Sequence, residues 1–452
     1  MSSYGLLGEK LGHSFSPAIH KQLWNCDYDL VPLPRNQVDE FFRKREFLGF
    51  NVTIPYKQIA CETCEHVDPK AMAIGAVNTV VNRDGVLYGY NTDYDGFLYC
   101  VRRAGIELAG KKILILGSGG TSLTSRNVAA DEGAKEIVVI SRSAPKVDPA
   151  SPAQSSESAL GNSRTESTSA ATTVGIFRKC PLSFDTYDHL ADRHRDADVI
   201  INTTPVGMYP NNYSTPVDLA LFPSLSGVVD VIYNPGTTLL VHQAREMGIP
   251  ATCGLPMLVA QGAYAAEHFS GQCFSDDDIE QVIRSVRAET SNIVLIGMPG
   301  CGKTTVGKAL SDALDREVVD VDALIVEREG RTIPDIFATD GEEYFRRCET
   351  EAAKIAGAKT GIIISCGGGL PTREENHFPM LQNGRIYYLD RDLNRLSIDG
   401  RPLSQQNRLI DLYEKRHPIY QALCHRQIIV AENDLQKMID EITEDFHENI
   451  GD

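Results

Sequence analysis

Short hydrophobic runs recur along the chain, and each is followed by a longer amphipathic stretch. Clear examples are residues 112–116 (KILIL), 136–140 (EIVVI) and 292–296 (NIVLI). Uninterrupted hydrophobic runs of this length are typical of strands buried on both faces of a parallel sheet, and the amphipathic stretches between them are typical of helices. The pattern therefore predicts an α/β protein built mainly on parallel sheets.

One segment, residues 144–173, breaks this pattern, because Ser, Ala, Thr, Pro and Glu dominate it and large hydrophobic residues are rare. Such a segment cannot bury enough surface to offset its ordering entropy, so we predict a disordered insertion. A chain of 452 residues is also too long for one ordinary domain. The expected domains are residues 1–105, 106–288 (with the insertion) and 292–452, joined by a short polar junction at 288–291.

Composition narrows the range of partners. Hydrophobic residues make up 42% of the chain, but no run approaches the roughly 18 residues of a membrane span. The formal net charge of −17 argues against nucleic acid, because a phosphate backbone requires a basic surface. The N-terminus resembles no signal peptide, and scattered cysteines fit a reducing compartment. We therefore expect a cytoplasmic protein that acts on small molecules, with an oligomer possible.

The most specific motif is residues 297–304 (GMPGCGKT), which match G-x-x-x-x-G-K-[ST] between a hydrophobic run and a helical stretch. A glycine turn at a helix N-terminus directs backbone N–H groups toward phosphate oxygens. Lys303 would reach the terminal phosphates and the Thr304 hydroxyl would hold Mg²⁺. The sequence predicts an ATP-type site formed by Gly300, Cys301, Gly302, Lys303, Thr304 and Thr305.

A second glycine turn, residues 117–120 (GSGG), separates the hydrophobic run at 112–116 from a helix and a second strand. Ser122 replaces the third glycine of the usual dinucleotide fingerprint, so the turn alone is a weak signal. The second strand is followed by a serine and an arginine where NAD sites carry an acidic residue, which favours the 2′-phosphate of NADP unless the arginine is merely solvated. The expected cofactor residues are Gly117, Ser118, Gly119, Gly120, Ser141, Arg142, Thr203 and Gly254.

Several polar residues in the first hundred positions lie at predicted strand ends, where α/β proteins place ligand-facing groups. Lys57 is expected at the start of a helix, where the helix dipole disfavours a lysine, so it is either solvated or held for chemistry. Asp93 and the asparagines Asn51, Asn78 and Asn91, all at strand ends, would complete a pocket for a hydroxylated acid. Ser14 and Ser16 precede a predicted helix, and their spacing alone favours helix capping over ligand contact.

The C-terminal part contains a similar set of candidate residues. Asp320 and Asp322 alternate along a hydrophobic run and are expected on one face of a strand, one near Mg²⁺ and the other near a substrate hydroxyl. Three consecutive glycines, Gly367, Gly368 and Gly369, would let a ligand approach the backbone. The polar run 390–400 is typical of a mobile lid, and several arginines nearby indicate an anionic substrate.

The first half, about residues 1–288, resembles shikimate dehydrogenases. The matching segments are residues 14–17 (SFSP), 51–57 (NVTIPYK), 91–93 (NTD), 202–208 (NTTPVGM), 230–235 (DVIYNP) and the helix 257–261. The resemblance implies that Lys57 and Asp93 form the catalytic pair. It also implies substrate contact, in place of capping, for the two serines. The implied substrate ligands are Ser14, Ser16, Thr53, Asn78, Tyr233 and Gln261.

The second half, about residues 292–450, is similar to shikimate kinases. The matching segments are the phosphate loop 297–304, residues 320–322 (DVD), 345–347 (FRR), 367–369 (GGG), 401–403 (RPL) and 416–420 (RHPIY). The segment between Leu389 and Arg401 is short for a kinase lid. The resemblance implies Lys303 and Asp322 as catalytic residues and Arg401 as the lid arginine. The implied shikimate ligands are Asp322, Arg346, Gly367, Gly368, Gly369 and Arg416.

Together the two resemblances imply a bifunctional enzyme of aromatic amino acid biosynthesis. NADPH would reduce 3-dehydroshikimate to shikimate, and ATP with Mg²⁺, held by Thr304 and Asp320, would phosphorylate shikimate. One alternative is that one half is degenerate and serves as a binding or regulatory module. Quinate as a further substrate and a non-enzymatic ATP-sensing scaffold are also open, although Lys57, Asp93, Lys303 and Asp322 are all present.

Overall fold

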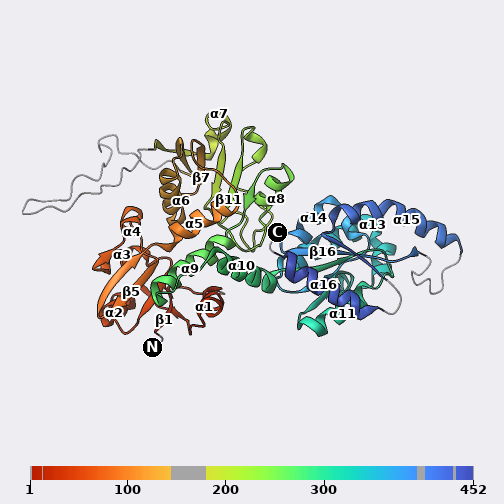
Figure 1. The fold of residues 1–452 in the computed structure, drawn as a ribbon. Helices are drawn as coiled ribbons and strands as arrows, with labels where there is room; N and C mark the ends of the chain where they lie inside the picture. The colour runs from red at the N-terminus through yellow and green to blue at the C-terminus, as the bar shows by residue number, and fades with distance from the viewer. Residues whose placement is uncertain (1–2, 13, 144–179, 394–402, 431–433, 451–452) are drawn as a thin grey trace, which may run out of the picture.

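The computed structural model describes residues 3–12, 14–143, 180–393, 403–430 and 434–450, with side chains between 403 and 408 left aside. The predicted insertion at 144–173, Arg401 and most of the expected lid lie outside the described residues. Figure 1 shows three sheets, each with its own helices, following one another along the chain. The prediction of an α/β protein is confirmed.

The first sheet is mixed and has the strand order β2-β1-β3-β5-β6-β4, with β5 antiparallel to both β3 and β6. Its core is aromatic and aliphatic, with Phe42, Phe50 and Tyr56 buried under the surrounding helices. The elements are β1 (Tyr4–Gly8), α1 (Ser16–Trp24), β2 (Asp29–Pro32), α2 (Arg35–Lys44), β3 (Gly49–Val52), α3 (Lys57–Thr63), β4 (His66–Val67), α4 (Pro69–Ile74), β5 (Thr79–Arg83), β6 (Val86–Tyr90) and α5 (Thr92–Arg103).

The second sheet is parallel throughout, in the order β12-β11-β10-β7-β8-β9. Two long helices then leave this sheet and pack against α1, so the chain returns to the first sheet (Figure 1). The elements are β7 (Lys112–Leu116), α6 (Gly120–Asp131), β8 (Glu136–Ser141), β9 (Leu182–Thr186), α7 (Leu190–Arg193), β10 (Val199–Asn202), β11 (Gly227–Asp230), α8 (Leu239–Glu246), β12 (Ala251–Thr252), α9 (Leu255–Ser270) and α10 (Asp276–Thr290).

The third sheet is also parallel, in the order β14-β15-β13-β16-β17. The central strand β13 leads directly into the glycine loop 297–302. The elements are β13 (Asn292–Ile296), α11 (Lys303–Leu314), β14 (Val318–Asp320), α12 (Val321–Glu329), α13 (Ile333–Ala358), β15 (Ile363–Ser365), α14 (His377–Leu381), β16 (Gly384–Asp390), α15 (Leu403–Leu423), β17 (Arg426–Ile429) and α16 (Leu435–Asn449).

Two local expectations are wrong. Asp320 and Asp322 do not share a strand face, because β14 ends at Asp320 and α12 begins at Val321. The Asp320 carboxylate accepts hydrogen bonds from the backbone N–H groups of Asp322 and Ala323, and this N-cap stabilises a helix where alternation predicted a strand. The junction at 288–291 is mostly the last turn of α10 rather than a linker.

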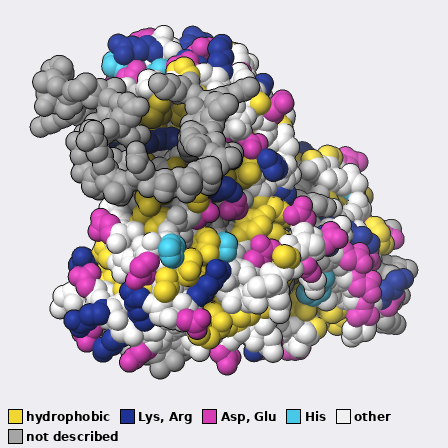
Figure 2. Space-filling model, turned by 60° about the vertical axis from the view of Figure 1, so that its left-hand side comes forward, with side chains coloured by type: hydrophobic (Ala, Val, Ile, Leu, Met, Phe, Trp, Pro, Cys, Tyr) yellow, Lys and Arg dark blue, Asp and Glu magenta, His cyan; other side chains and the backbone are white. Residues whose placement is uncertain are grey.

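The surface carries charge of both signs. Figure 2 shows acidic and basic side chains intermixed on the face in view. Charged side chains are therefore spread over this face rather than gathered at one site.

None of the helices in the described ranges is both long enough and apolar enough to cross a bilayer.

A buried histidine, His20, joins α1 to the first sheet. Trp24 Nε1 donates to His20 Nδ1 over 3.1 Å, so the proton of the neutral ring lies on Nε2, which contacts Asn51 Oδ1 at 3.2 Å. The ring stacks on Tyr28 with 4.1 Å between centroids. Burial lowers the pKa of His20 to about 4, and a second ring proton would point at the Trp24 N–H. The fold therefore requires the neutral form.

This histidine predicts a loss of stability in mild acid. Its pKa is lower in the folded chain than in the unfolded chain, so its stabilisation is complete above pH 6.5 and is lost as the pH falls toward 4. The expected loss in the free energy of unfolding is about 3 kcal/mol. Fluorescence of Trp24, the single tryptophan, measures it during urea unfolding at pH 7 and pH 4.5. His20→Gln should show a smaller decline between the two pH values, and an equal decline would contradict the assignment.

Candidate functional site

A cavity of about 240 Å³ lies between the first two sheets. It is closed by the start of α3, the start of α5, the loop after β11 and the helix α9. Every side chain that the sequence assigned to the first substrate lines this cavity, although these residues span almost 250 positions of the chain. They are Ser14, Ser16, Thr53, Lys57, Asn78, Asp93, Tyr233 and Gln261.

An ion pair between Lys57 and Asp93 stands at the wall of this cavity. Lys57 is the first residue of α3 and Asp93 lies in the first turn of α5, with 2.5 Å between Nζ and Oδ2. The side chains are 26% and 16% exposed, so they are partly shielded but open to the cavity. The carboxylate is favoured at its helix N-terminus and the lysine is not, so the lysine depends on its partner. The pair places a transferable proton beside the cavity.

The remaining polar side chains are linked to one another around the pocket. Ser14 Oγ donates to Ser16 Oγ over 3.2 Å, while the N-cap of α1 is Phe15, which makes no side-chain cap. Asn78 Nδ2 donates to Thr92 Oγ1 over 3.0 Å and lies 3.5 Å from Gln261 Oε1. These hydroxyls and amides can donate to and accept from a polyhydroxylated ligand.

Sequence reasoning missed most of the apolar wall. Asn51, one of the asparagines expected at the pocket, does line the cavity. Its amide donates to Thr79 Oγ1 over 3.0 Å and its Oδ1 accepts from Tyr28 over 2.7 Å, so it also holds the strands together. The wall residues carry no polar group that could mark them in the sequence. They are Leu6, Val52, Val231, Met257 and Leu258.

The glycine turn 117–120 adjoins the cavity at the start of α6. Gly117 has a φ of +100°, and a Cβ placed on it would lie 2.9 Å from Thr203 Oγ1, so the turn needs glycine here. Thr203 Oγ1 in turn donates to the carbonyl of Leu116 over 2.7 Å. Ser141 ends β8 and Arg142 follows it at the same sheet edge, since β7 and β8 are parallel neighbours. This edge fits a dinucleotide with phosphates at the helix N-terminus.

Two further positions bear on the cofactor prediction: Gly254, which the sequence assigned to the cofactor, and Ser122, which departs from the glycine fingerprint. Gly254 is the N-cap of α9 and lines the cavity, so it is close to both the turn and the ion pair. Ser122, at the third position of the glycine fingerprint, is buried inside α6 with no hydrogen-bond partner for its hydroxyl among the described residues. A small residue is sufficient there because the position packs against the sheet and not against a ligand.

The phosphate loop of the third sheet forms a second candidate site. Lys303 is the first residue of α11, and its buried Nζ donates to the carbonyls of Gly297 and Met298, each over 3.0 Å. Thr304 Oγ1 donates to Asp320 Oδ2 over 3.2 Å. A hydroxyl and a carboxylate at this distance, beside a phosphate loop, fit the oxygen ligands that Mg²⁺ prefers.

The three predicted anion and hydroxyl ligands converge on the triple glycine 367–369. A Cβ on the first glycine would lie 2.7 Å from Asp322 Oδ1, on the second 3.2 Å from Arg416 Nη1, and on the third 2.1 Å from Arg346 Nη1. A side chain at any of these glycines would push the ligand-facing group away from this position. Burial and the neighbouring Asp320 raise the pKa of Asp322. The structure thus brings these residues together beside the phosphate loop.

Glu349 belongs to this cluster and was not assigned from the sequence. Its buried carboxylate lies 2.5 Å from Arg346 Nη1, and burial raises its pKa. The spacing of three residues along α13 was a signal for the pair. Tyr420 closes the other side, because its hydroxyl donates to the carbonyl of Gly368. Both contacts hold the arginine and glycine positions in place.

Comparison with known proteins divides the chain in the same way. The family model for the shikimate dehydrogenase substrate binding domain matches residues 6–80, and the model for shikimate kinase matches residues 299–447. An NADP(+)-type shikimate dehydrogenase of Clostridium perfringens is 35% identical over 279 residues, which are 60% of this chain and 93% of the relative. One of Bacillus cereus is 36% identical over 289 residues, which are 62% of this chain and 96% of the relative.

Solved structures agree for the first two sheets. A chorismate mutase/shikimate 5-dehydrogenase fusion protein from Clostridium acetobutylicum matches with a TM-score of 0.52 and 32% identity, over 63% of this chain and 96% of that protein. The shikimate 5-dehydrogenase of Thermus thermophilus, solved with NADP(H) and shikimate, matches with a TM-score of 0.50 and 27% identity, over 63% of this chain and 99% of that enzyme.

Proposed function

The chain belongs to the shikimate dehydrogenase family through its N-terminal part and carries a shikimate kinase domain behind it, and from this premise we propose that both parts are active. The first would reduce 3-dehydroshikimate to shikimate with NADPH, and the second would phosphorylate shikimate with ATP and Mg²⁺. The observation that supports this most is the convergence of the predicted residues on one cavity around Lys57 and Asp93. We divide the chain into residues 1–105, 106–288 and 292–452.

For the first reaction, bound NADPH supplies the hydride to the ketone carbon. Lys57 holds a proton at Nζ and donates it to the oxygen that becomes the new hydroxyl, while Asp93 orients Nζ from 2.5 Å away. Tyr233, Gln261 and the two serines bind the hydroxyl and carboxylate groups of the substrate. The apolar wall limits access of water to the transferred proton.

For the second reaction, ATP would supply the phosphoryl group, and Thr304 and Asp320 would hold Mg²⁺, which would neutralise part of the phosphate charge. Lys303 exchanges its contacts with two loop carbonyls for contacts with phosphate oxygens. Asp322 orients the attacking hydroxyl, and its raised pKa makes it a better proton acceptor. Arg346 and Arg416 bind the substrate carboxylate.

A coupled assay on the purified full chain tests this function. The assay supplies 3-dehydroshikimate, NADPH, ATP and Mg²⁺, and it measures NADPH oxidation separately from phosphorylated product. Both signals are expected. Oxidation without phosphorylation, even with shikimate added directly, would favour the alternative in which the kinase half is degenerate. Oxidation of quinate in place of shikimate, with NADP⁺, measures the substrate range of the first site.

Arg142 predicts the choice of cofactor. The residue is exposed directly after β8, where it can pair with a 2′-phosphate. Arg142→Ala is expected to raise the KM for NADPH by at least about tenfold, the effect of one charge-assisted hydrogen bond. NADH lacks this phosphate, so its KM should stay the same and serves as the internal control. An equal rise for both cofactors would show that the arginine acts on the fold or on another group.

A further inference from the structure

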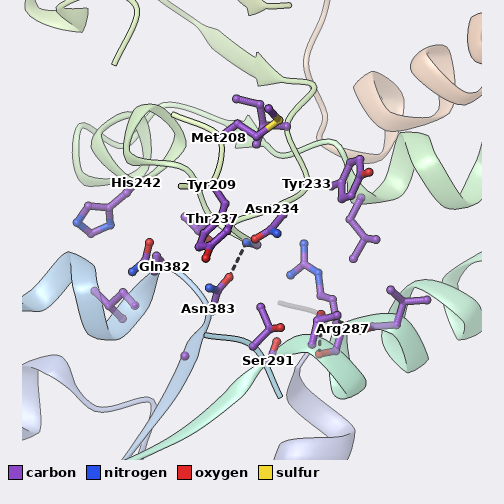
Figure 3. Close-up of a pocket in the computed structure, with 18 of the residues that line it drawn as sticks. Met208, Tyr209, Tyr233, Asn234, Thr237, His242, Arg287, Ser291, Gln382 and Asn383 are labelled. Atoms are coloured by element: carbon purple, nitrogen blue, oxygen red, sulfur yellow. Dashed lines mark hydrogen bonds between the residues drawn. The ribbon is translucent and has the colours of Figure 1, made fainter. Parts of the chain in front are cut away.

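A large cavity among the described residues lies between the two halves of the chain, and Figure 3 shows its interior. We call it the junction chamber; its volume is about 780 Å³, enough for a ligand of drug size. The loops after β10 and β11 form one wall, the end of α10 forms the floor, and residues 381–385 of the kinase half form the opposite wall. None of the assignments made above uses it as a whole.

Fixed polar contacts between the halves build this chamber. Asn383 Oδ1 accepts from the N–H of Gly236 over 2.8 Å, the contact drawn in Figure 3. The carbonyl of Gln382 accepts from the N–H of Thr237 over 2.8 Å, and its fully buried side chain accepts from Asn212 Nδ2 over 2.7 Å. Buried contacts of this kind are costly to break, so the chamber is a built part of the molecule.

Arg287 rises from α10 into the chamber, toward Asn234 and Tyr233 (Figure 3). Its guanidinium has no hydrogen bond or ion pair with any other residue within the described ranges. Burial is the main cause that lowers the pKa of Arg287; Arg103 and Arg245 lower it further, while Cys253 and Glu280 partly oppose the shift. A shielded cation without a directly paired counter-charge is unfavourable, so this position is suited to an anion that enters from solution.

A second group in the chamber also lacks a partner. The Oδ1 atom of Asn234 is buried and makes no hydrogen bond within the part of the chain that the structure describes. A ligand hydroxyl can satisfy it once the Asn234 side chain turns toward the chamber, because a hydroxyl can donate to an amide oxygen or accept from an amide nitrogen. Phe15, Met208 and Tyr209 supply apolar surface around these two polar groups.

We propose that the junction chamber is a binding site for a small ring-shaped carboxylic acid that carries hydroxyl groups. The carboxylate pairs with Arg287, a hydroxyl bonds to Asn234, and the ring packs on the apolar side chains. The chamber shares Val231 and Tyr233 with the cavity around Lys57, so a ligand here contacts the loop that carries Tyr233. The proposal goes beyond the two reactions, and only the choice of shikimate as probe rests on them.

The site is separate from the phosphate loop. The chamber is lined by Ser291 and Gly384, which stand at the amino ends of β13 and β16. The phosphate loop follows the carboxyl end of β13. A ligand in the chamber is therefore on the opposite edge of the third sheet from Lys303, and its binding adds to that of the kinase site.

Equilibrium dialysis of the full chain with shikimate, without nucleotides, tests the proposal. Arg287→Met should bind one shikimate fewer per chain than the unaltered protein, and Arg287→Lys should retain that site with weaker affinity. Arg284→Met is the matched control, because Arg284 is exposed on the same helix. Cyclohexanecarboxylate, which lacks hydroxyl groups, should bind the chamber at least about tenfold more weakly than shikimate.

The result that would overturn the proposal is equal binding by Arg287→Met and the unaltered protein. If Arg287→Met is poorly folded, unchanged affinity of the chamber in the folded Arg287→Lys variant has the same meaning. Failure of the proposed reactions is distinguishable, because a missing active site lowers the number of bound molecules equally in every variant. A difference of one bound shikimate per chain between Arg284→Met and Arg287→Met then still shows whether the chamber binds shikimate.

Discussion

Lys57→Met is expected to lower the rate of NADPH-dependent reduction of 3-dehydroshikimate by about 10²–10⁴-fold, the usual contribution of a general acid. The variant keeps the length of the side chain but removes the protonated Nζ, which lies 2.5 Å from Asp93 Oδ2. Phosphorylation of added shikimate should continue at its original rate, because the kinase residues belong to another sheet. The measurement is the initial rate of each reaction on one preparation.

The chain offers a matched control for this variant. Lys70 also forms an ion pair with an aspartate of α5, at 2.7 Å from Asp95, but the two side chains are 50% and 35% exposed and line no part of the cavity around Lys57. Lys70→Met should therefore change the reduction rate by less than about twofold, as expected for an exposed pair. Equal losses in the two variants would show that the ion pair at Lys57 serves the fold and not the proton transfer.

The phosphate loop lies on the side of the third sheet that faces away from the dehydrogenase half, and this position decides how shikimate moves between the two proposed sites. Gln382 and Asn383 precede β16 and hold the loops after β10 and β11, so the kinase half faces the dehydrogenase half with the amino ends of its strands. The phosphate loop lies at their carboxyl ends. Under the proposed function, shikimate therefore reaches the second site around the domain and not through this interface.

Local chemistry explains which features the sequence could predict. Glycine turns, buried strands and the residues that follow them are set by neighbouring positions, so the two glycine loops and Lys57 at the start of α3 were all expected. Alternation failed at Asp320 because a side-chain cap to two backbone N–H groups stabilises a helix start over strand pairing. The apolar wall of the first cavity gave no signal, since such residues are ordinary core residues in the sequence.

The sequence could not predict features that depend on burial or on contacts between distant segments. The spacing of Glu349 and Arg346 along one helix allows a pair, but the burial of the glutamate is visible only in the structure. The junction chamber combines Asn234, Arg287 and Asn383 from three distant segments, and of these only Asn234 lies in a recognisable motif. Packing between the dehydrogenase half and the kinase half decides which hydrogen-bond partners these residues have.

Lys303→Met is the variant with the largest expected effect on the second reaction. Its Nζ is the buried cation of the phosphate loop and is held by two carbonyls that a phosphate oxygen can replace. Its loss should lower the rate of shikimate phosphorylation by about 10²–10³-fold, the effect of removing a preorganised group that stabilises developing charge. The reduction of 3-dehydroshikimate should stay the same, which also reports that the chain is folded. Lys308→Met, exposed on the same helix, is the control and should phosphorylate shikimate normally. A loss in Lys303→Met below about threefold would mean that the loop binds its phosphate through backbone N–H groups alone.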